Sequence, residues 1–338
     1  MGHNISRRRM LELAGAAGGL ALAGPYGRAA RAQAVKRVDK FAPELDKIID
    51  VAEPILELGT GFGGGGNAEG PVWWHEGGYL LFSSIGDNRL IKYVPGQGTS
   101  IAKEPTNGAN GHTRDPAGRM ISCEGFLRRV TREEKDGSIT VVANNYQGKR
   151  INKPNDVIAK SDGSIYFTDP WNIPDLPQPW DLDFNGVYRV SPDLGTINLL
   201  TKDLFLPNGL AFSQDEKILY IGDSRRRSIF AFDVMGNGLI ANQTQRLYAD
   251  LAGPEPGGPD GFKVDLAGNV YTGGAGGIHI VDPSGRKLGR IVHGQPQTTN
   301  ICFGGDDWKT LYFTTHSTFG SVKLKTAGVP VPVAAKRV

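Results

Sequence analysis

The stretch NKPNDVIAKSDGSIYFTDP, from Asn152 to Pro170, combines a polar motif, a glycine turn and a run of β-branched and aromatic residues. Short runs of this kind, bounded by Gly or Asp turns, are typical of antiparallel strands. The same order recurs around Glu69 in NAEGPVWW, around Asn208 in LPNGLAFSQDEKILYIGDS and around Asp260 in GGPDGFKVDLAGNVYTGG. The chain therefore contains an internal repeat in which an acid or amide precedes a strand.

Six segments follow this pattern, and successive segments start about 40 to 53 residues apart. Such a period suits a four-stranded blade and is too long for a helical hairpin repeat. The 47 glycines and 21 prolines also disfavour long helices, and only Phe41 to Val51 is a candidate for a short helix or a peripheral strand. The sequence predicts an all-β six-bladed β-propeller whose repeats begin near Gly77, Gly118, Gly163, Glu216, Gly268 and Trp308.

The first 34 residues have the pattern of an export signal. SRRRML, from Ser6 to Leu11, precedes a short apolar, glycine-rich run, which fits a twin-arginine signal better than a surface helix. We expect residues 1–34 to be removed and residues 35–338 to form one propeller domain. The expected location is periplasmic or secreted in a bacterium, and the export machinery is a partner during targeting.

The charge balance gives no indication of a polyanionic partner. Residues 1–34 carry five arginines and one glutamate, so the formal charge of +3 for the whole chain falls to near −1 without them. We therefore expect neither a nucleic acid nor a membrane as a partner. Cys123 and Cys302 lie in strand-like runs, and we expect buried, unlinked thiols, although the compartment would permit a disulfide.

Several motifs, in their order and spacing, resemble the senescence marker protein, gluconolactonase and regucalcin-like family, and bacterial gluconolactonase-type members in particular. The resemblance covers roughly Asn67 to Thr315. It implies a six-bladed propeller with a divalent metal, most often calcium, in the central channel. The motifs are EGPVWW, NGHTRDPAGR followed by CEGFLRRVTR, NKPNDVIAKSDGSIYFTDP, PNGLAFSQDEKILYIGDS, PDGFKVDLAGNVYTG and NICFGGDDWKTLYFTT.

The resemblance also implies roles for individual residues. Glu69, Asn208 and Asp260 match the metal ligands of the family. Asn155 matches a substrate-binding position that touches the metal in some relatives. Lys153 stands where some relatives carry a substrate-contacting arginine, and Asn110 matches an Asn-Gly pair that would face the channel. One departure is Gly125, where many relatives carry histidine.

The chemistry of these residues supports a metal independently of the resemblance. Carboxylate and amide oxygens suit Ca²⁺, with Mg²⁺ or Mn²⁺ as alternatives, and are poor ligands for Zn²⁺. Glu69 and Asp260 together balance a charge of +2, which avoids an unpaired buried charge. Other interpretations stay open, because Asn208 and Asp260 lie in turn-forming PNG and PDG sequences and Glu69 could be an exposed loop charge.

Other polar residues are expected to have structural roles. Asp156, Asp169 and Asp223 close or follow the repeats, where aspartate commonly pins turns. Arg225, Arg226 and Arg227 are expected in a solvated hairpin turn. The histidines lack a neighbouring nucleophile motif, so they do not indicate a Ser-His-Asp triad; they are His112, His279, His293 and His316.

The function that follows from the resemblance is a metal-dependent lactonase, which opens a small sugar-derived lactone by adding water. Asp260 is the catalytic candidate, because it could both bind the metal and position or deprotonate the attacking water. Two alternatives stay open: a phosphotriesterase or fluorophosphatase with a similar metal, and a non-catalytic propeller that holds calcium structurally. Likeness of fold does not fix the substrate.

Overall fold

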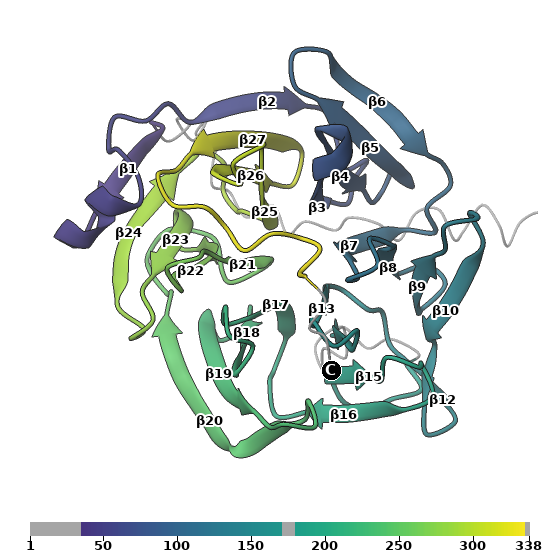
Figure 1. Cartoon of the computed structure of the whole chain (residues 1–338). Coiled ribbons are helices and arrows are strands. Elements are labelled where there is room, and N and C mark those ends of the chain that lie inside the picture. Colours follow the sequence, from purple (N-terminus) through teal and green to yellow (C-terminus); the bar gives the residue numbers. More distant parts are fainter. Residues whose placement is uncertain (1–34, 171–179, 335–338) are drawn as a thin grey trace, which may run out of the picture. The chain divides into compact units, whose positions relative to one another are not determined.

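The computed structural model describes residues 35–170 and 180–334, which form antiparallel sheets arranged around a central channel. The export signal predicted for residues 1–34 lies outside the described residues. Figure 1 looks along the channel and shows the sheets as six blades, with the first strand of each repeat innermost. The predicted six-bladed β-propeller is therefore confirmed.

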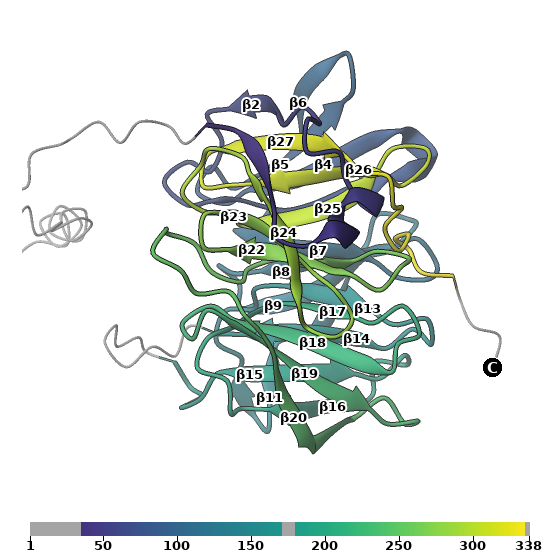
Figure 2. The same ribbon diagram turned by 90° about the vertical axis from the view of Figure 1, so that its left-hand side faces the viewer.

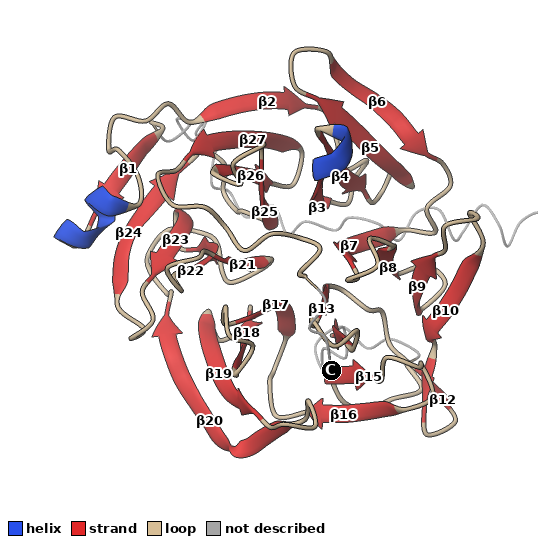
Figure 3. Ribbon diagram, viewed as in Figure 1, coloured by secondary structure: helices blue, strands red, loops and turns tan. Residues whose placement is uncertain are grey.

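Each blade is an antiparallel sheet of four strands, or five in the fifth blade, with the strands coloured red in Figure 3. The first two blades contain β3 (Ala68–Trp74), β4 (Tyr79–Ser84), β5 (Arg89–Val94), β6 (Gly98–Lys103), β7 (Ala109–Arg114), β8 (Met120–Glu124), β9 (Arg129–Glu133) and β10 (Ile139–Ala143). After the small hairpin of β11 (Asn145–Tyr146) and β12 (Lys149–Arg150), the third and fourth blades contain β13 (Val157–Ala159), β14 (Ile165–Asp169), β15 (Gly186–Val190), β16 (Ile197–Thr201), β17 (Pro207–Phe212), β18 (Ile218–Asp223), β19 (Ser228–Val234) and β20 (Ile240–Asp250). The last two contain β21 (Phe262–Val264), β22 (Val270–Gly274), β23 (Gly277–Val281), β24 (Lys287–Val292), β25 (Asn300–Gly304), β26 (Thr310–Thr314) and β27 (Thr318–Lys323).

Two N-terminal strands complete the two C-terminal blades. β2 (Leu56–Thr60) pairs with β27 as the outer strand of the sixth blade, and β1 (Arg37–Lys40) adds a fifth strand beside β24. Strands from both ends of the chain thus share sheets, so the sixth blade is not left with only three strands. This arrangement limits the number of open strand edges.

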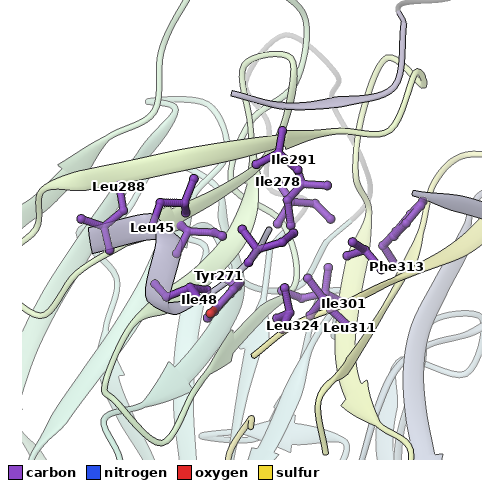
Figure 4. Close-up of a cluster of buried hydrophobic side chains, with 14 of the residues drawn as sticks. Leu45, Ile48, Tyr271, Ile278, Leu288, Ile291, Ile301, Leu311, Phe313 and Leu324 are labelled. Carbon is purple, nitrogen blue, oxygen red and sulfur yellow. The ribbon is translucent and has the colours of Figure 1, made fainter. Parts of the chain in front are cut away.

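A short helix near the N-terminus packs onto the last blades, as Figure 4 shows. The 3₁₀ helix η1 (Pro43–Lys47) lies within the segment predicted to be a helix or a peripheral strand, and β1 immediately precedes that segment. Leu45 is fully buried in a cluster with Leu288 of β24 and Tyr271 of β22. Burying such a leucine contributes about 1.5–3 kcal/mol, so η1 anchors the N-terminal strands. A second 3₁₀ helix, η2 (His75–Gly77), joins β3 to β4.

The burial of the strands follows their place in the blade. All five residues of β14 are buried, because a middle strand has packed blades on both faces, whereas all six residues of β6 are exposed. Cys123 and Cys302 are buried free thiols, which confirms the expectation that they are unlinked. Across residues 35–170 and 180–334, none of the helices is both long and apolar enough to cross a bilayer.

Candidate metal centre and active site

The acids and amides of the motifs lie where the inner strands begin. Pairing with the second strand is irregular between Glu69 and Val72 on β3, and irregular between Pro207 and Leu210, around Asn208, on β17. A β-bulge of this kind changes the direction of a side chain and is common beside functional sites. The corresponding residue of β7, Asn110, lies in the same kind of irregularity.

On β13 and β21 regular pairing starts just after the motif residue, and on β25 it starts at Asn300 itself. β13 begins at Val157, after Asn155, and β21 begins at Phe262, after Asp260. The inner strands lie side by side around the channel and each is the first strand of its blade. The six motif positions therefore gather at one end of the channel.

Glycine after the motif residue allows neighbouring inner strands to approach closely. A Cβ added to Gly209 would overlap the carbonyl oxygen of Asp260, and one added to Gly261 would overlap the side chain of Asn300. The NG and DG dipeptides are thus explained by close backbone packing between blades. Asn208 itself lies within β17 and not in a turn.

Three carboxylates are buried together at this end of the channel. Glu69 and Asp156 are each 2% exposed and Asp260 is 4% exposed. Burial, followed by repulsion from Asp156, raises the pKa of Glu69 to about 8. Burial, followed by the charges of Glu69 and Asp156, raises the pKa of Asp260 well above its usual value. Each of these carboxylates acts electrostatically on at least one of the others, and we refer to the three as the acidic cluster.

Several oxygen atoms beside the cluster have no hydrogen-bond donor. Buried acceptors without a partner cost about 1–3 kcal/mol each and are rare in native structures. Asn208 donates its Nδ2 hydrogen to Ser224 Oγ at 3.0 Å, which leaves its Oδ1 for another ligand. The unpartnered atoms are Asn208 Oδ1, Asp260 Oδ1, Asp156 Oδ2 and Asn110 Oδ1.

These observations fit a hard divalent cation. The second oxygen of Asp260 accepts a hydrogen bond from Gln297 Nε2 at 3.1 Å, and Glu69 Oε2 accepts one from the Gly70 amide at 3.0 Å. One oxygen of Asp260 is therefore held by the protein while the other has no partner, and the Glu69 carboxylate is oriented by the Gly70 amide and the side chain of Asn300. Within the described ranges no three His, Cys, Asp or Glu side chains form a metal-binding group. A cation here would depend on the amide oxygen of Asn208 as well as on carboxylates.

The substrate-binding candidates lie on or beside the adjacent inner strands. Asn155 is 4% exposed and its backbone carbonyl accepts a hydrogen bond from the Gly111 amide at 2.9 Å, next to Asn110. Lys153 precedes β13, and its backbone amide donates to Asp169 Oδ1 at 2.7 Å. Partial burial lowers the pKa of the Lys153 ammonium. The structure thus places Asn155, Lys153 and Asn110 near the strand starts that carry the acidic cluster.

Of the three aspartates that were expected to have structural roles, two have such a role and one does not. Asp169 accepts the backbone amides of Asn152 and Lys153, both at 2.7 Å, and Asp223 likewise accepts the amide of Phe205 at 2.7 Å. These two aspartates do support loops. Asp156 departs from the expectation, because it belongs to the acidic cluster and has an oxygen without a partner.

Asn300 and Gln297 contact the acidic cluster, and neither was predicted from the sequence motifs as a site residue. Asn300 begins β25, the sixth inner strand, and is 2% exposed. Its side chain interacts with Glu69 and Asp156 and opposes the effect of burial on their pKa values. The sixfold repeat itself was a signal for Asn300, since the first residue of NICFGG occupies the position of the other motif residues.

A family model, a relative of known name and a solved structure all indicate the same family. The family model described as SMP-30/Gluconolactonase/LRE-like region matches residues 67–317. A gluconolactonase from Zymomonas mobilis is 34% identical over 320 residues, which cover 87% of this chain and 88% of that protein. A solved gluconolactonase structure from Xanthomonas campestris has a TM-score of 0.75 at 29% identity, covering 85% of this chain and 95% of that chain.

A calcium-binding regucalcin from Agrobacterium tumefaciens shares the fold, with a TM-score of 0.69 at 17% identity, covering 84% of this chain and 98% of that chain. The family model matches most of the chain and the Zymomonas protein is 34% identical, so the similarity is one of sequence as well as of fold. The chain belongs to the SMP-30/gluconolactonase/LRE-like family.

Proposed function

We propose that this protein is a hydrolase that opens a small, sugar-derived lactone by adding water, and that it uses a divalent cation, Ca²⁺ in the first place. The observation that carries the proposal is the set of unpartnered oxygens on Asn208 and Asp260 beside buried carboxylates. Two relatives named as gluconolactonases support a lactone as substrate. The calcium-binding protein with the same fold supports the choice of cation.

Glu69, Asn208 and Asp260 would hold the cation through one oxygen each. A bound cation supplies Lewis-acid polarisation of the lactone carbonyl and stabilises the negative charge that develops on its oxygen. Because Gln297 fixes one oxygen of Asp260, the carboxylate is oriented before substrate binds. Such pre-orientation lowers the entropic cost of reaching the reactive geometry.

Asp260 would position the attacking water and accept its proton. Carboxylates are stronger bases when their pKa is raised, and burial together with Glu69 and Asp156 raises the pKa of Asp260. A cation acts in the opposite direction on the same carboxylate, so Glu69 is the second candidate for the proton acceptor. The two residues lie in one cluster, and either acceptor leaves the overall reaction unchanged.

Asn155, Asn110 and Lys153 would orient the substrate. An amide side chain offers both a donor and an acceptor, which suits the hydroxyl groups of a sugar ring. Asn110 has a buried Oδ1 that no protein donor reaches, so a ring hydroxyl could donate to it. Lys153 would contribute a charge-assisted hydrogen bond to a ring oxygen or to the acid that is released.

A panel of lactones tests the proposal directly. Purified protein is assayed with and without a chelator, beside Asp260→Ala and Glu69→Gln variants whose β-sheet circular dichroism is unchanged. We expect the chelator and both variants to abolish most of the hydrolysis, and added Ca²⁺ to restore the wild type after chelation. Full activity in either variant contradicts the mechanism.

The same preparation separates the alternatives. Faster turnover of paraoxon than of gluconolactone would identify a phosphotriesterase. Stoichiometric calcium binding without hydrolysis of any lactone would favour a non-catalytic binding propeller.

We also propose that residues 1–34 direct twin-arginine export. Replacing Arg7 and Arg8 by lysine would then retain the protein in the cytoplasm of the native bacterium. Fractionation with an antibody against the propeller measures this, and periplasmic recovery of the double variant would contradict it.

A further inference from the structure

The channel has a second layer of side chains beyond the acidic cluster. It consists of the residues three positions after each motif residue on the six inner strands. A strand rises about 3.3 Å per residue, so this ring lies at most about 10 Å from the cluster along the channel. Its members are Val72, Thr113, Ile158, Ala211, Lys263 and Phe303.

The ring lines two cavities that share residues. A cavity of about 420 Å³ is lined by Thr113, Ile158, Ala211 and Lys263, and a smaller one is lined by Val72, Thr113, Lys263 and Phe303. Each member of the ring therefore lines at least one of two cavities, and Thr113 and Lys263 line both. Lys263 is the one charged side chain among these six.

The C-terminal segment closes this end of the channel. Figure 1 shows it crossing the centre of the six blades, and Figure 2 shows it leaving on one face. The Val329 amide donates to the Val264 carbonyl and the Gly328 amide to the Trp308 carbonyl, both at 2.9 Å. Val329 and Val331 line both cavities. The segment thus places apolar side chains between Lys263 and bulk water.

Lys263 is within electrostatic reach of the acidic cluster. Its Nζ donates a hydrogen bond to the Phe262 carbonyl at 2.8 Å, which keeps the partly buried ammonium close to its own strand. Burial is the largest influence on the pKa of Glu69 and of Asp156 and raises both, and the charge of Lys263 opposes it. The ammonium therefore acts on the cluster from the next layer of the channel.

The acidic cluster and the ring that contains Lys263 together carry a net negative charge. Glu69, Asp156 and Asp260 carry three negative charges when ionised, one more than a divalent cation neutralises. Lys263 brings the total to −2. We propose that Lys263 is an internal counter-charge that matches the acidic cluster to one divalent cation and thereby sets the calcium affinity. This inference rests on the proposed metal site.

The inference predicts opposite effects with and without calcium. Removing the positive charge strengthens the attraction of the cluster for a divalent ion. A unit positive charge about 10 Å from a divalent ion changes its affinity by about fourfold at an effective dielectric constant of about 80 and by on the order of a few hundredfold at about 20, and tenfold corresponds to about 50. Without calcium, the same change leaves the carboxylates less compensated and lowers the melting temperature.

Calorimetric titration of calcium into protein that a chelator has freed of metal tests the inference about Lys263. Lys263→Met removes the charge and keeps an unbranched side chain, Lys263→Arg keeps the charge, and Lys217→Met removes a lysine whose side chain is 80% exposed. We expect Lys263→Met to bind calcium at least about tenfold more tightly, with a lower melting temperature in chelator and a larger rise on adding calcium. Lys263→Arg and Lys217→Met should stay within about threefold of the wild-type Kd.

An unchanged or weaker calcium affinity in folded Lys263→Met overturns this inference and leaves the proposed function intact. Absence of calcium binding by the wild-type protein would overturn the proposed metal site and this inference with it. Should Lys263→Met not fold in chelator, Lys263→Gln makes the same change of charge with a polar side chain, and its calcium affinity decides.

Discussion

The two ends of the central channel are built from the same six strands but have different chemistry. Where the strands begin, pairing is irregular and polar residues such as Glu69 and Asn208 lie in the channel. A few residues further on, pairing is regular, and the lining is mostly apolar and covered by the C-terminal segment. Irregular pairing over a few residues at the start of an inner strand is therefore enough to place reactive groups on a stable sheet. Function and stability should therefore respond to different substitutions.

The largest effect is expected at the polar end. Asp260→Ala should lower kcat/KM for a lactone by at least about 10³-fold, because it removes a metal ligand and the proposed base together. Its melting temperature in chelator should be unchanged or higher, since one of three mutually repelling carboxylates is gone. Lactone kinetics and thermal denaturation measure both, with exposed Asp306→Asn as the control. A large loss of stability with retained activity would mean that the polar end of the channel serves stability and not function.

The apolar end should show the opposite behaviour. Phe303 is 3% exposed and packs edge-to-face on Tyr271, with ring centroids 5.2 Å apart. Phe303→Ala should lower the free energy of unfolding by about 3–5 kcal/mol while the folded fraction keeps its kcat. Urea denaturation measures this, and Leu247→Ala, at a side chain 60% exposed, should change stability by less than about 0.5 kcal/mol. A change below about 1 kcal/mol in Phe303→Ala would argue against a structural role for this layer.

The acidic cluster should make the metal-free protein sensitive to alkali. The pKa of Glu69 is raised to about 8 in the folded state, so the folded protein binds more protons than the unfolded chain below that pH. Stability in chelator should therefore fall by about 1.5 kcal/mol from Glu69 alone as pH rises from 6.5 to 8.

Below pH 6.5 another effect opposes this one. Burial lowers the pKa of His112 to about 3 and of His293 to about 4, and stability from these groups is lost as pH falls below the unfolded value of about 6.5. Above pH 6.5 these histidines contribute little, so the window from pH 6.5 to 8 reports the buried carboxylates with raised pKa values, which are Glu69, Asp260 and Asp169. Urea titrations across it should show a slope that Glu69→Gln or added calcium reduces. Constant stability of the chelated wild type would contradict the buried-carboxylate assignment.

The smallest effect is expected at Lys153. Replacing Lys153 by methionine should raise KM for the lactone by about tenfold with little change in kcat, because a hydrogen bond from a charged group contributes about 1.5–3 kcal/mol when buried and less here. Exposed Lys149→Met is the matched control. An equal fall in kcat and kcat/KM would instead place Lys153 in the chemical step.

The architecture could be read from the sequence because each blade repeats one local pattern. Turns rich in glycine or aspartate before strand runs located all six blades, as the turns near Gly118 and Gly268 show. The pairing of β1 and β2 with the last two blades was not predicted, since these strands carry no motif and join partners more than 200 residues away. Pairing at that distance depends on closure of the whole ring.

The site was predictable only in part, for a similar reason. Asp156 follows Asn155 directly, and its place in the cluster depends on where the regular pairing of β13 begins, at Val157, which leaves no mark in the sequence. Arg227 was expected in a solvated turn, but its guanidinium donates to the carbonyls of Gly253, Glu255 and Gly257 at 2.6–2.9 Å. The hairpin turn and the exposure of Arg225 and Arg226 are as predicted, and only Arg227 departs from the prediction, because its long side chain reaches a neighbouring loop that sequence spacing does not place.

A crystal structure of the protein grown with calcium would test the metal centre most directly. We predict one ion in the channel, about 2.3–2.6 Å from the Asn208 Oδ1 atom and from one carboxylate oxygen each of Glu69 and Asp260. A channel that contains only water at millimolar calcium, or an ion bound elsewhere, would contradict it.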